Sequence, residues 1–145
     1  MNPVMVIFRI GAEPAALRLE DVAAVHEPVP VAPVAGFADA VCGLATVSGE
    51  VVTVIDPARL LAGHSPATVP DAAGLLLLLD GEARGVALAL DGPVQVRAAG
   101  TGRSLDTSGA LAPLCRTACT GADGTPTGIV EPGRVLALAS RDGCR

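Results

Sequence analysis

The chain has 145 residues, of which 50% are hydrophobic, so it can bury the core of one domain. A net charge of -5 argues against nucleic acid and anionic membrane surfaces as partners. With an aromatic content of 1%, the chain also lacks the aromatic side chains on which proteins stack single-stranded nucleic acids and most sugars. The amino terminus has no basic stretch followed by an apolar segment, and Leu75 to Leu79 is too short to span a bilayer, so the sequence predicts a cytoplasmic protein without direct membrane insertion.

Two strands and a connector are predicted at the beginning of the chain. Val4 to Ile10 forms the first strand, and after a turn at Gly11 to Pro14 apolar and polar residues alternate from Ala15 to Glu20. These segments predict a hairpin. Val22 to Val25 follows, and then the proline-spaced connector Glu27 to Pro33, which is extended because proline lacks the amide hydrogen that helices and central strands need.

The most informative stretch comes next. Two apolar runs, Val41 to Val47 and Val51 to Ile55, flank a Ser48-Gly49 turn, which predicts a β-hairpin. Asp56 then supplies a helix cap and Pro57 a suitable first helical residue. Strand, turn, strand and short helix thus follow one another without spare residues.

A weaker copy of this unit lies near the end of the chain. Asp123-Gly124 leads into Thr125 to Val130, and Glu131-Pro132 opens a further short helix. Ile55 to Ala62 is echoed residue by residue in Val130 to Ala137. This internal repeat predicts two similar half-domains.

The region between the copies contains a connector and another hairpin. Gly63 to Gly74 has two prolines among small and polar residues, which is typical of a connection between halves. Leu75 to Leu79 and Val86 to Leu90 predict the hairpin, Ala98 to Ser108 is expected to be a loop, and Leu111 to Ala118 is ambiguous between strand and helix, with a strand preferred. We therefore expect a single domain over residues 1–145, with subdomains at approximately 4–65 and 70–140.

Short alternating strands in two half-domains indicate an all-β fold. Two small antiparallel barrels or two curled sheets both satisfy the pattern. A parallel sheet covered by helices would need long amphipathic helices, which the sequence lacks.

Metal, cofactor and disulfide chemistry is not indicated. Cys42 lies in an apolar run, as a buried thiol does, and Cys115 and Cys119 have no second pair at zinc-site spacing. His26 and His64 stand alone and are expected on the surface. The four cysteines, which include Cys144, are therefore predicted to be reduced, with no metal or cofactor site.

Enzymatic readings are also disfavoured. Gly100 to Ser104 lacks the lysine of a phosphate loop, and Ser48 lacks both the flanking motif of a hydrolase nucleophile and a histidine to activate it. Asp56 and Glu131 each have a sufficient local role in capping the helix that follows. The sequence therefore predicts no catalytic residue and a protein that is not an enzyme.

With these half-domains, the chain resembles the CheW-like domain of bacterial chemosensory systems from about Val4 to Ala139. The hairpin start of that family appears as Phe8 to Gly11, and its valine-rich segment before spaced prolines appears as Val22 to Val25. Its most specific stretch appears as Gly43 to Ala58, and its second-half motif as Val86 to Asp91.

The resemblance implies two SH3-like, five-stranded antiparallel β-barrel subdomains with short helices, acting as a non-catalytic adaptor. The implied partners are the helical tip of a methyl-accepting chemoreceptor, bound around the groove between the halves, and a CheA-type histidine kinase or another CheW-like protein, bound at barrel edges and loops. Carried over by position, the receptor-side residues are Val22, Gly43, Ser48, Gly49 and Ala87. Glu50 is expected to be an exposed charge that steers a partner.

At several positions this chain has a residue that differs from the family pattern. Thr46, Ser48 and Thr53 stand where the family has Asn, Arg and Pro. Serine in place of arginine removes a bidentate donor worth about 1–3 kcal/mol if it pairs with a carboxylate.

We therefore hypothesise an accessory CheW-like protein, comparable in kind to FrzB of the Frz gliding-motility system, that is recruited to receptor clusters and has weakened kinase coupling. Two alternatives stay open: a standard CheW that couples receptor to kinase, and a small-molecule-binding β-barrel sensor.

Overall fold

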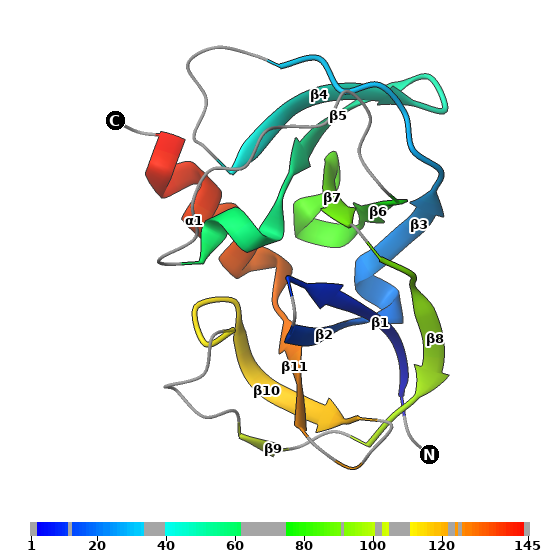
Figure 1. The fold of residues 1–145 in the computed structure, drawn as a ribbon, viewed down its shortest axis with the longest axis vertical. Coiled ribbons are helices and arrows are strands. Elements are labelled where there is room, and N and C mark those ends of the chain that lie inside the picture. Colours follow the sequence, from blue (N-terminus) through cyan, green and yellow to red (C-terminus); the bar gives the residue numbers. More distant parts are fainter. Residues whose placement is uncertain are drawn as a thin grey trace.

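The computed structural model describes residues 3–11, 13–33, 40–61, 75–90, 92–100, 103–104, 111–121, 124 and 126–143. The described strands form two sheets, drawn one above the other in Figure 1, and a helix lies along one side of their junction. The predicted all-β architecture with short helices is confirmed. The connector predicted from Gly63 to Gly74 lies outside the described residues.

The first sheet combines strands from both ends of the chain. Its strands are β1 (Val4–Ile10), β2 (Glu13–Arg18), β8 (Gln95–Ala98), β9 (Arg103–Ser104), β10 (Cys115–Thr120) and β11 (Pro126–Val130). They pair in the order β8-β1-β2-β11-β10-β9, and β2 runs parallel to β11. This sheet has six strands, counting the two-residue β9, whereas five antiparallel strands were expected.

The second sheet is built from the middle of the chain. Its strands are β3 (Val22–His26), β4 (Val41–Val47), β5 (Glu50–Ile55), β6 (Leu75–Leu79) and β7 (Val86–Leu90). They pair in the order β3-β6-β7-β5-β4, and β5 runs parallel to β7. Three short 3-10 helices, η1 (Leu19–Asp21), η2 (Pro57–Leu60) and η3 (Gly81–Ala83), lie between strands, and α1 (Pro132–Gly143) ends the described chain.

The two sheets have the same pairing pattern. With β9 left aside, each sheet has three antiparallel pairs and one parallel pair in the same order, so that β8, β1, β2, β11 and β10 correspond to β3, β6, β7, β5 and β4. The order along the chain differs because β1 and β2 come first, although their counterparts β6 and β7 come last. The internal repeat is therefore real, but it is circularly permuted.

This permutation corrects the expected division at residues 65–70. β1 and β2 join the sheet of the carboxy-terminal strands, and β6 and β7 join the sheet of β4 and β5. The boundary between the sheets therefore falls after β2 and again after β7, because the parallel pairings join segments that are distant in sequence. Hairpins were predictable from local pattern, but these long-range pairings were not.

The repeated corner after each central hairpin is preserved in detail. The amide of Asp56 donates to the carbonyl of Ala40 over 2.8 Å, and the amide of Glu131 donates to the carbonyl of Leu114 over 2.9 Å. The Asp56 carboxylate accepts from the amide of Ala58, so the predicted cap of η2 is confirmed. After Glu131 the corner continues as α1, a helix of 12 residues, which is longer than the sequence suggested.

One predicted strand begins later than expected. The amides of Leu114 and Cys115 both donate to the carbonyl of Leu111, which closes a turn over the first residues of the segment Leu111 to Ala118. The strand therefore starts at Cys115. Within the loop expected from Ala98 to Ser108, Ala98 is the last residue of β8, a strand that was not predicted, and Arg103 and Ser104 pair as β9.

Three apolar clusters hold the fold together. The central cluster lies between the sheets and includes Phe8, Leu77 and Leu88. Each sheet also has a smaller inner cluster on its other face, which includes Val54 in the second sheet and Ile129 in the first. The unbroken leucine run of β6 follows from this arrangement, because alternate leucines face the central cluster and an inner cluster. Val135 of α1 is also fully buried in the central cluster.

Candidate protein-interaction surface

The β4–β5 hairpin ends in a tight two-residue turn. Val47 pairs with Glu50, and Ser48 and Gly49 between them have φ angles of 51° and 83°. Positive φ at both positions is the geometry of a type I′ turn, which matches the twist of a hairpin. Ser48, Gly49 and Glu50 are all exposed, so these three predicted contact residues are accessible together at the hairpin tip.

An apolar side chain is exposed next to this turn. Val51 lies directly opposite Thr46 on β4 and is 65% exposed, the largest exposure among the large hydrophobic side chains of the described residues. Thr53 and Leu44 form the next pair on the same face and are half-buried. The tip is therefore a small mixed surface of hydroxyl, carboxylate and aliphatic groups.

Two other predicted contact residues are buried. Ala87 is 0% exposed and belongs to the inner cluster of the second sheet, so it is not available to a partner in this conformation. Gly43 is buried in β4 with φ 148°, and a Cβ atom at this position would collide with the carbonyl of Ala32. Gly43 therefore permits a close backbone approach, in which Ala32 and Leu44 exchange hydrogen bonds of 2.8 and 2.9 Å.

Val22 lies far from the hairpin tip in the sheet order. It begins β3, the edge strand opposite β4, and its half-buried side chain packs against the central cluster. The six predicted residues are thus not one site: three are at the hairpin tip, two are buried and one is at the sheet junction.

A larger exposed apolar surface surrounds the junction on the side of Val22. We call it the waist patch, and it consists of Val4, Leu19, Val25 and Val96, which are 39%, 47%, 45% and 57% exposed. Val96 lies opposite Val6, and Val25 lies opposite Leu77, so both are on the faces that build the central cluster. This patch was not predicted from the sequence, although the alternation of Val94, Val96 and Ala98 with polar residues indicates the β8 part of it.

The waist patch and α1 lie on opposite sides of the junction. Figure 1 shows β3 of the second sheet and β8 of the first sheet on one side of the junction, and α1 on the other side. The helix buries Val135 in the central cluster and packs against η2 and η3. The central cluster is therefore covered by a helix on one side and ends in exposed aliphatic side chains on the other.

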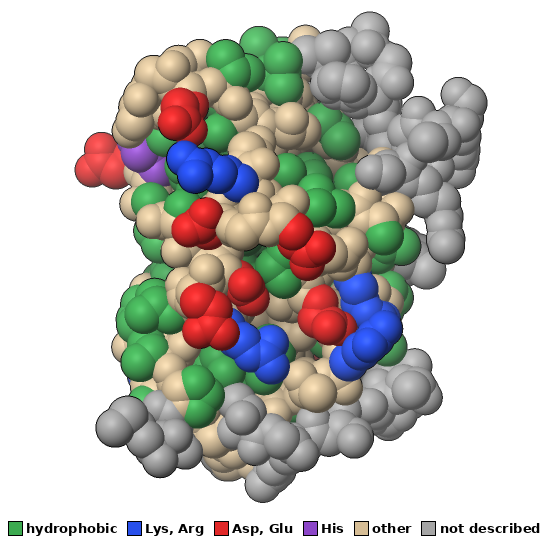
Figure 2. Space-filling model, turned by 180° about the vertical axis from the view of Figure 1, so that it is seen from behind, with side chains coloured by type: hydrophobic (Ala, Val, Ile, Leu, Met, Phe, Trp, Pro, Cys, Tyr) green, Lys and Arg blue, Asp and Glu red, His purple; other side chains and the backbone are tan. Residues whose placement is uncertain are grey.

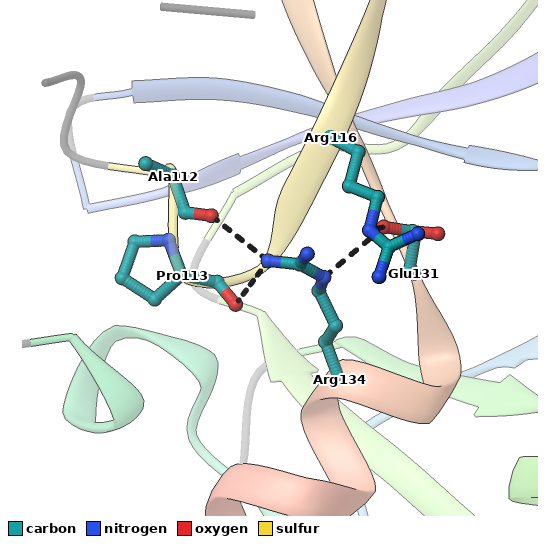
Figure 3. A network of polar contacts seen from close by, with 5 residues as sticks. All are labelled: Ala112, Pro113, Arg116, Glu131 and Arg134. Atoms are coloured by element: carbon teal, nitrogen blue, oxygen red, sulfur yellow. Dashed lines mark hydrogen bonds and ion pairs between the residues drawn. The ribbon is translucent and has the colours of Figure 1, made fainter. Parts of the chain in front are cut away.

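Ion pairs repeat at the two corners. Arg59 pairs with Asp56 over 3.5 Å, and Arg134 pairs with Glu131 over 3.2 Å, each three residues after its partner. Arg116 also reaches Glu131 over 3.6 Å, and the Arg134 guanidinium donates to the carbonyls of Ala112 and Pro113, as Figure 3 shows. Asp56 and Glu131 therefore each have an arginine partner in their own corner, and these contacts hold the chain in place.

The three described thiols are buried and separated. Cys42, Cys115 and Cys119 belong to three different clusters and are free. Burial, followed by the charge of Glu131, raises the pKa of Cys115 to about 12, against a smaller opposing effect of Arg134. Burial also raises the pKa values of Cys42 and Cys119. Among the described residues no group of three or more His, Cys, Asp or Glu side chains is arranged to hold a metal ion, and Cys144 and His64 lie outside them.

Comparison with known proteins identifies the family. The CheW-like domain matches residues 4–139, almost the whole chain. The chain belongs to the CheW-like domain family. This membership supports a non-catalytic scaffold or adaptor in chemotaxis signalling, and the exposed, mostly apolar surfaces of this CheW-like domain agree with such a role.

The fold has a solved counterpart. The scaffolding protein TtCheW from Thermoanaerobacter tengcongensis superimposes with a TM-score of 0.74 at 15% identity, with 90% of each chain covered. At this identity the likeness establishes the fold. No curated protein sequence matches the chain significantly. In the part of the chain that the structure describes, no helix has the length and apolar character needed to cross a membrane.

Proposed function

We propose that this CheW-like domain is an accessory adaptor that binds the helical tip of a methyl-accepting chemoreceptor at the waist patch and couples only weakly to a CheA-type histidine kinase. The observation that carries the proposal is the unequal cover of the central cluster, with α1 on one side and exposed valine and leucine side chains on the other. A receptor helix with an apolar stripe would cover that second side, as helices do in other apolar docking surfaces.

We assign the hairpin tip to the kinase side, and not to the receptor side that the resemblance gave for Ser48 and Gly49, because β4 and β3 are opposite edges of the second sheet and the waist patch lies on the side of β3. Ser48 is exposed at the first position of the type I′ turn, where the family pattern has arginine. A serine hydroxyl reaches less far than a guanidinium and cannot pair with a carboxylate through two parallel hydrogen bonds. The proposed site of action is the cytoplasm, at receptor clusters.

One observation favours the second candidate, a standard adaptor that couples receptor and kinase. Val51 and Glu50 remain exposed beside the turn, so the tip keeps an apolar and a charged contact for a kinase domain or another CheW-like protein. The two candidates predict the same receptor contact and differ in the affinity of the kinase contact.

Separate calorimetric titrations against a soluble receptor signalling-tip fragment and a CheA regulatory domain test the proposal. We expect the receptor fragment to bind at least about tenfold more tightly than the kinase domain, a difference of about 1.4 kcal/mol. Leu19→Asp and Val25→Asp should each weaken receptor binding by about tenfold or more, because a charge is placed on an apolar contact. Val51→Asp is the matched control and should leave receptor binding unchanged.

Ser48→Arg tests the kinase side of the proposal. It should raise affinity for the CheA domain without changing affinity for the receptor fragment, because only the hairpin tip is altered. Equal and tight binding of both partners by the unsubstituted chain would instead establish the standard adaptor. Receptor binding that resists both waist-patch substitutions would refute the proposed contact surface.

A further inference from the structure

Two arginines of the first sheet, Arg18 and Arg97, lie on the face turned away from the waist patch. Arg18 of β2 and Arg97 of β8 are both in register with Met5 of β1. Met5 is fully buried in the inner cluster of that sheet, whereas Val4, next to it in sequence, belongs to the waist patch. Because successive side chains of a strand alternate between faces, Arg18 and Arg97 point away from the side of Val4.

Carboxylates border the waist patch. Glu20 and Asp21 follow Leu19 directly in η1. The amide of Asp80 donates to the carbonyl of Asp21 over 2.9 Å, which brings η3 beside η1, and the carboxylate of Glu82 in η3 lies against Gly133 at the start of α1.

These carboxylates are close enough to influence one another. Partial burial, then the charge of Glu20, raises the pKa of Asp21, and Glu82 adds to this effect while Arg18 opposes it. Figure 2 shows acidic side chains across the middle of the molecule, with basic and hydrophobic ones among them. Around Asp21, Glu20 and Glu82 are opposed by Arg18, so the charge at this end of the patch is net negative.

We propose that the waist patch selects partner helices that carry arginine or lysine beside their apolar stripe, through the carboxylates of Glu20 and Asp21. The inference rests on the proposed function, because it names the chemistry of the partner at the same surface. Opposite charges at the rim of an apolar contact raise the association rate and reject partners of like charge. A helix with acidic flanks meets repulsion at the same place.

Synthetic helical peptides provide the probes. Two 21-residue alanine-based peptides carry the same leucine stripe, and the positions beside the stripe are arginine in one peptide and glutamate in the other. We expect the full chain to bind the arginine peptide at least about tenfold more tightly in 50 mM salt, with a difference of less than about threefold in 0.5 M salt, where the Debye length is a few ångströms.

A pair of variants separates the local effect from net charge. The double variant Glu20→Gln, Asp21→Asn should abolish most of the preference for the arginine peptide. The single variant Glu13→Gln, at the exposed start of β2, makes the same change in net charge as Glu20→Gln alone; it should retain the preference, whereas Glu20→Gln should reduce it. A preference that survives the double variant, or that falls equally in the two single variants, overturns the inference.

The outcome is distinguishable from failure of the proposed function. If the receptor fragment binds the waist patch with an affinity that the Glu20→Gln, Asp21→Asn variant leaves unchanged, the adaptor function stands and the charge selection is wrong. If the peptides show the charge preference but the receptor fragment does not bind, the chemistry of the surface stands and the receptor assignment is wrong.

Discussion

Cys115 illustrates how one buried side chain responds to its surroundings. It lies at the start of β10, 4% exposed, between the central cluster and the Glu131 carboxylate. Both neighbours disfavour a thiolate, because an ion loses hydration on burial and like charges repel. The pKa of the Cys115 thiol is therefore raised to about 12, which makes the thiol a packing group and a poor nucleophile.

We predict that Cys115 resists alkylation in the folded protein. In a Cys144→Ser background, iodoacetamide at pH 8 should label the native chain far more slowly than the chain unfolded in guanidinium, because the thiolate is the reactive species. Because the folded state binds the proton more tightly than the unfolded state, stability should fall as the pH rises above about 9 toward 12. Peptide mapping by mass spectrometry identifies the labelled residue, and native labelling at the unfolded rate would contradict the prediction.

At the level of elements, the contact between β4 and the connector after β3 depends on the absence of a side chain at Gly43. The connector reaches β4 at the edge of the sheet farthest from β3 and pairs there through Ala32. The two hydrogen bonds to Leu44 satisfy backbone groups that would otherwise face outward from an edge strand. Gly43 is thus a structural residue, although the sequence resemblance placed it at a partner contact.

Gly43→Ala should destabilise the fold by about 3 kcal/mol or more, because the new methyl group collides with backbone atoms of Ala32 and Pro33. Gly49→Ala is the matched control: its φ of 83° is also unfavourable for alanine, but its Cβ would meet nothing within 4 Å, so we expect a loss of about 1 kcal/mol. Urea unfolding followed by circular dichroism measures both. Equal losses would show that the contact with Ala32 does not constrain β4.

The accuracy of sequence prediction also differs between elements. The β4–β5 and β6–β7 hairpins were predictable because apolar runs and turn residues are local signals. Ala87, which the resemblance placed among the receptor-side residues, is buried because β7 is covered on both faces, and the sequence pattern of β7 does not show which of its residues are accessible. The waist patch contains residues from both sheets, so the pattern of a single segment cannot predict which side chains come together there.

At the scale of the whole molecule, the circular permutation ties the two sheets together. The chain leaves the first sheet after β2, builds the second sheet completely and returns at β8. It therefore crosses the junction twice between strands, and α1 crosses along it after β11. The central cluster draws residues from both sheets and from α1, so neither sheet keeps its full core without the other.

Val135 of α1 contributes to this shared core. Val135 is 0% exposed in the central cluster, and Val135→Ala should lower stability by about 2 kcal/mol through lost burial and a small cavity. For a chain of this length the unfolding midpoint should fall by roughly 4–8 °C. Ala137→Ser, at an exposed position of the same helix, is the control and should cost about 0.5 kcal/mol through helix propensity alone.

Amide hydrogen exchange shows whether the loss is shared by both sheets. If the central cluster couples them, peptides from β6–β7 and from β10–β11 should lose protection together in Val135→Ala, because both depend on the same cooperative unit. Loss of protection confined to the β10–β11 peptides would show instead that α1 stabilises only the sheet from which it emerges. In that case the second sheet would fold on its own, and the waist patch would lie at a junction between independent units.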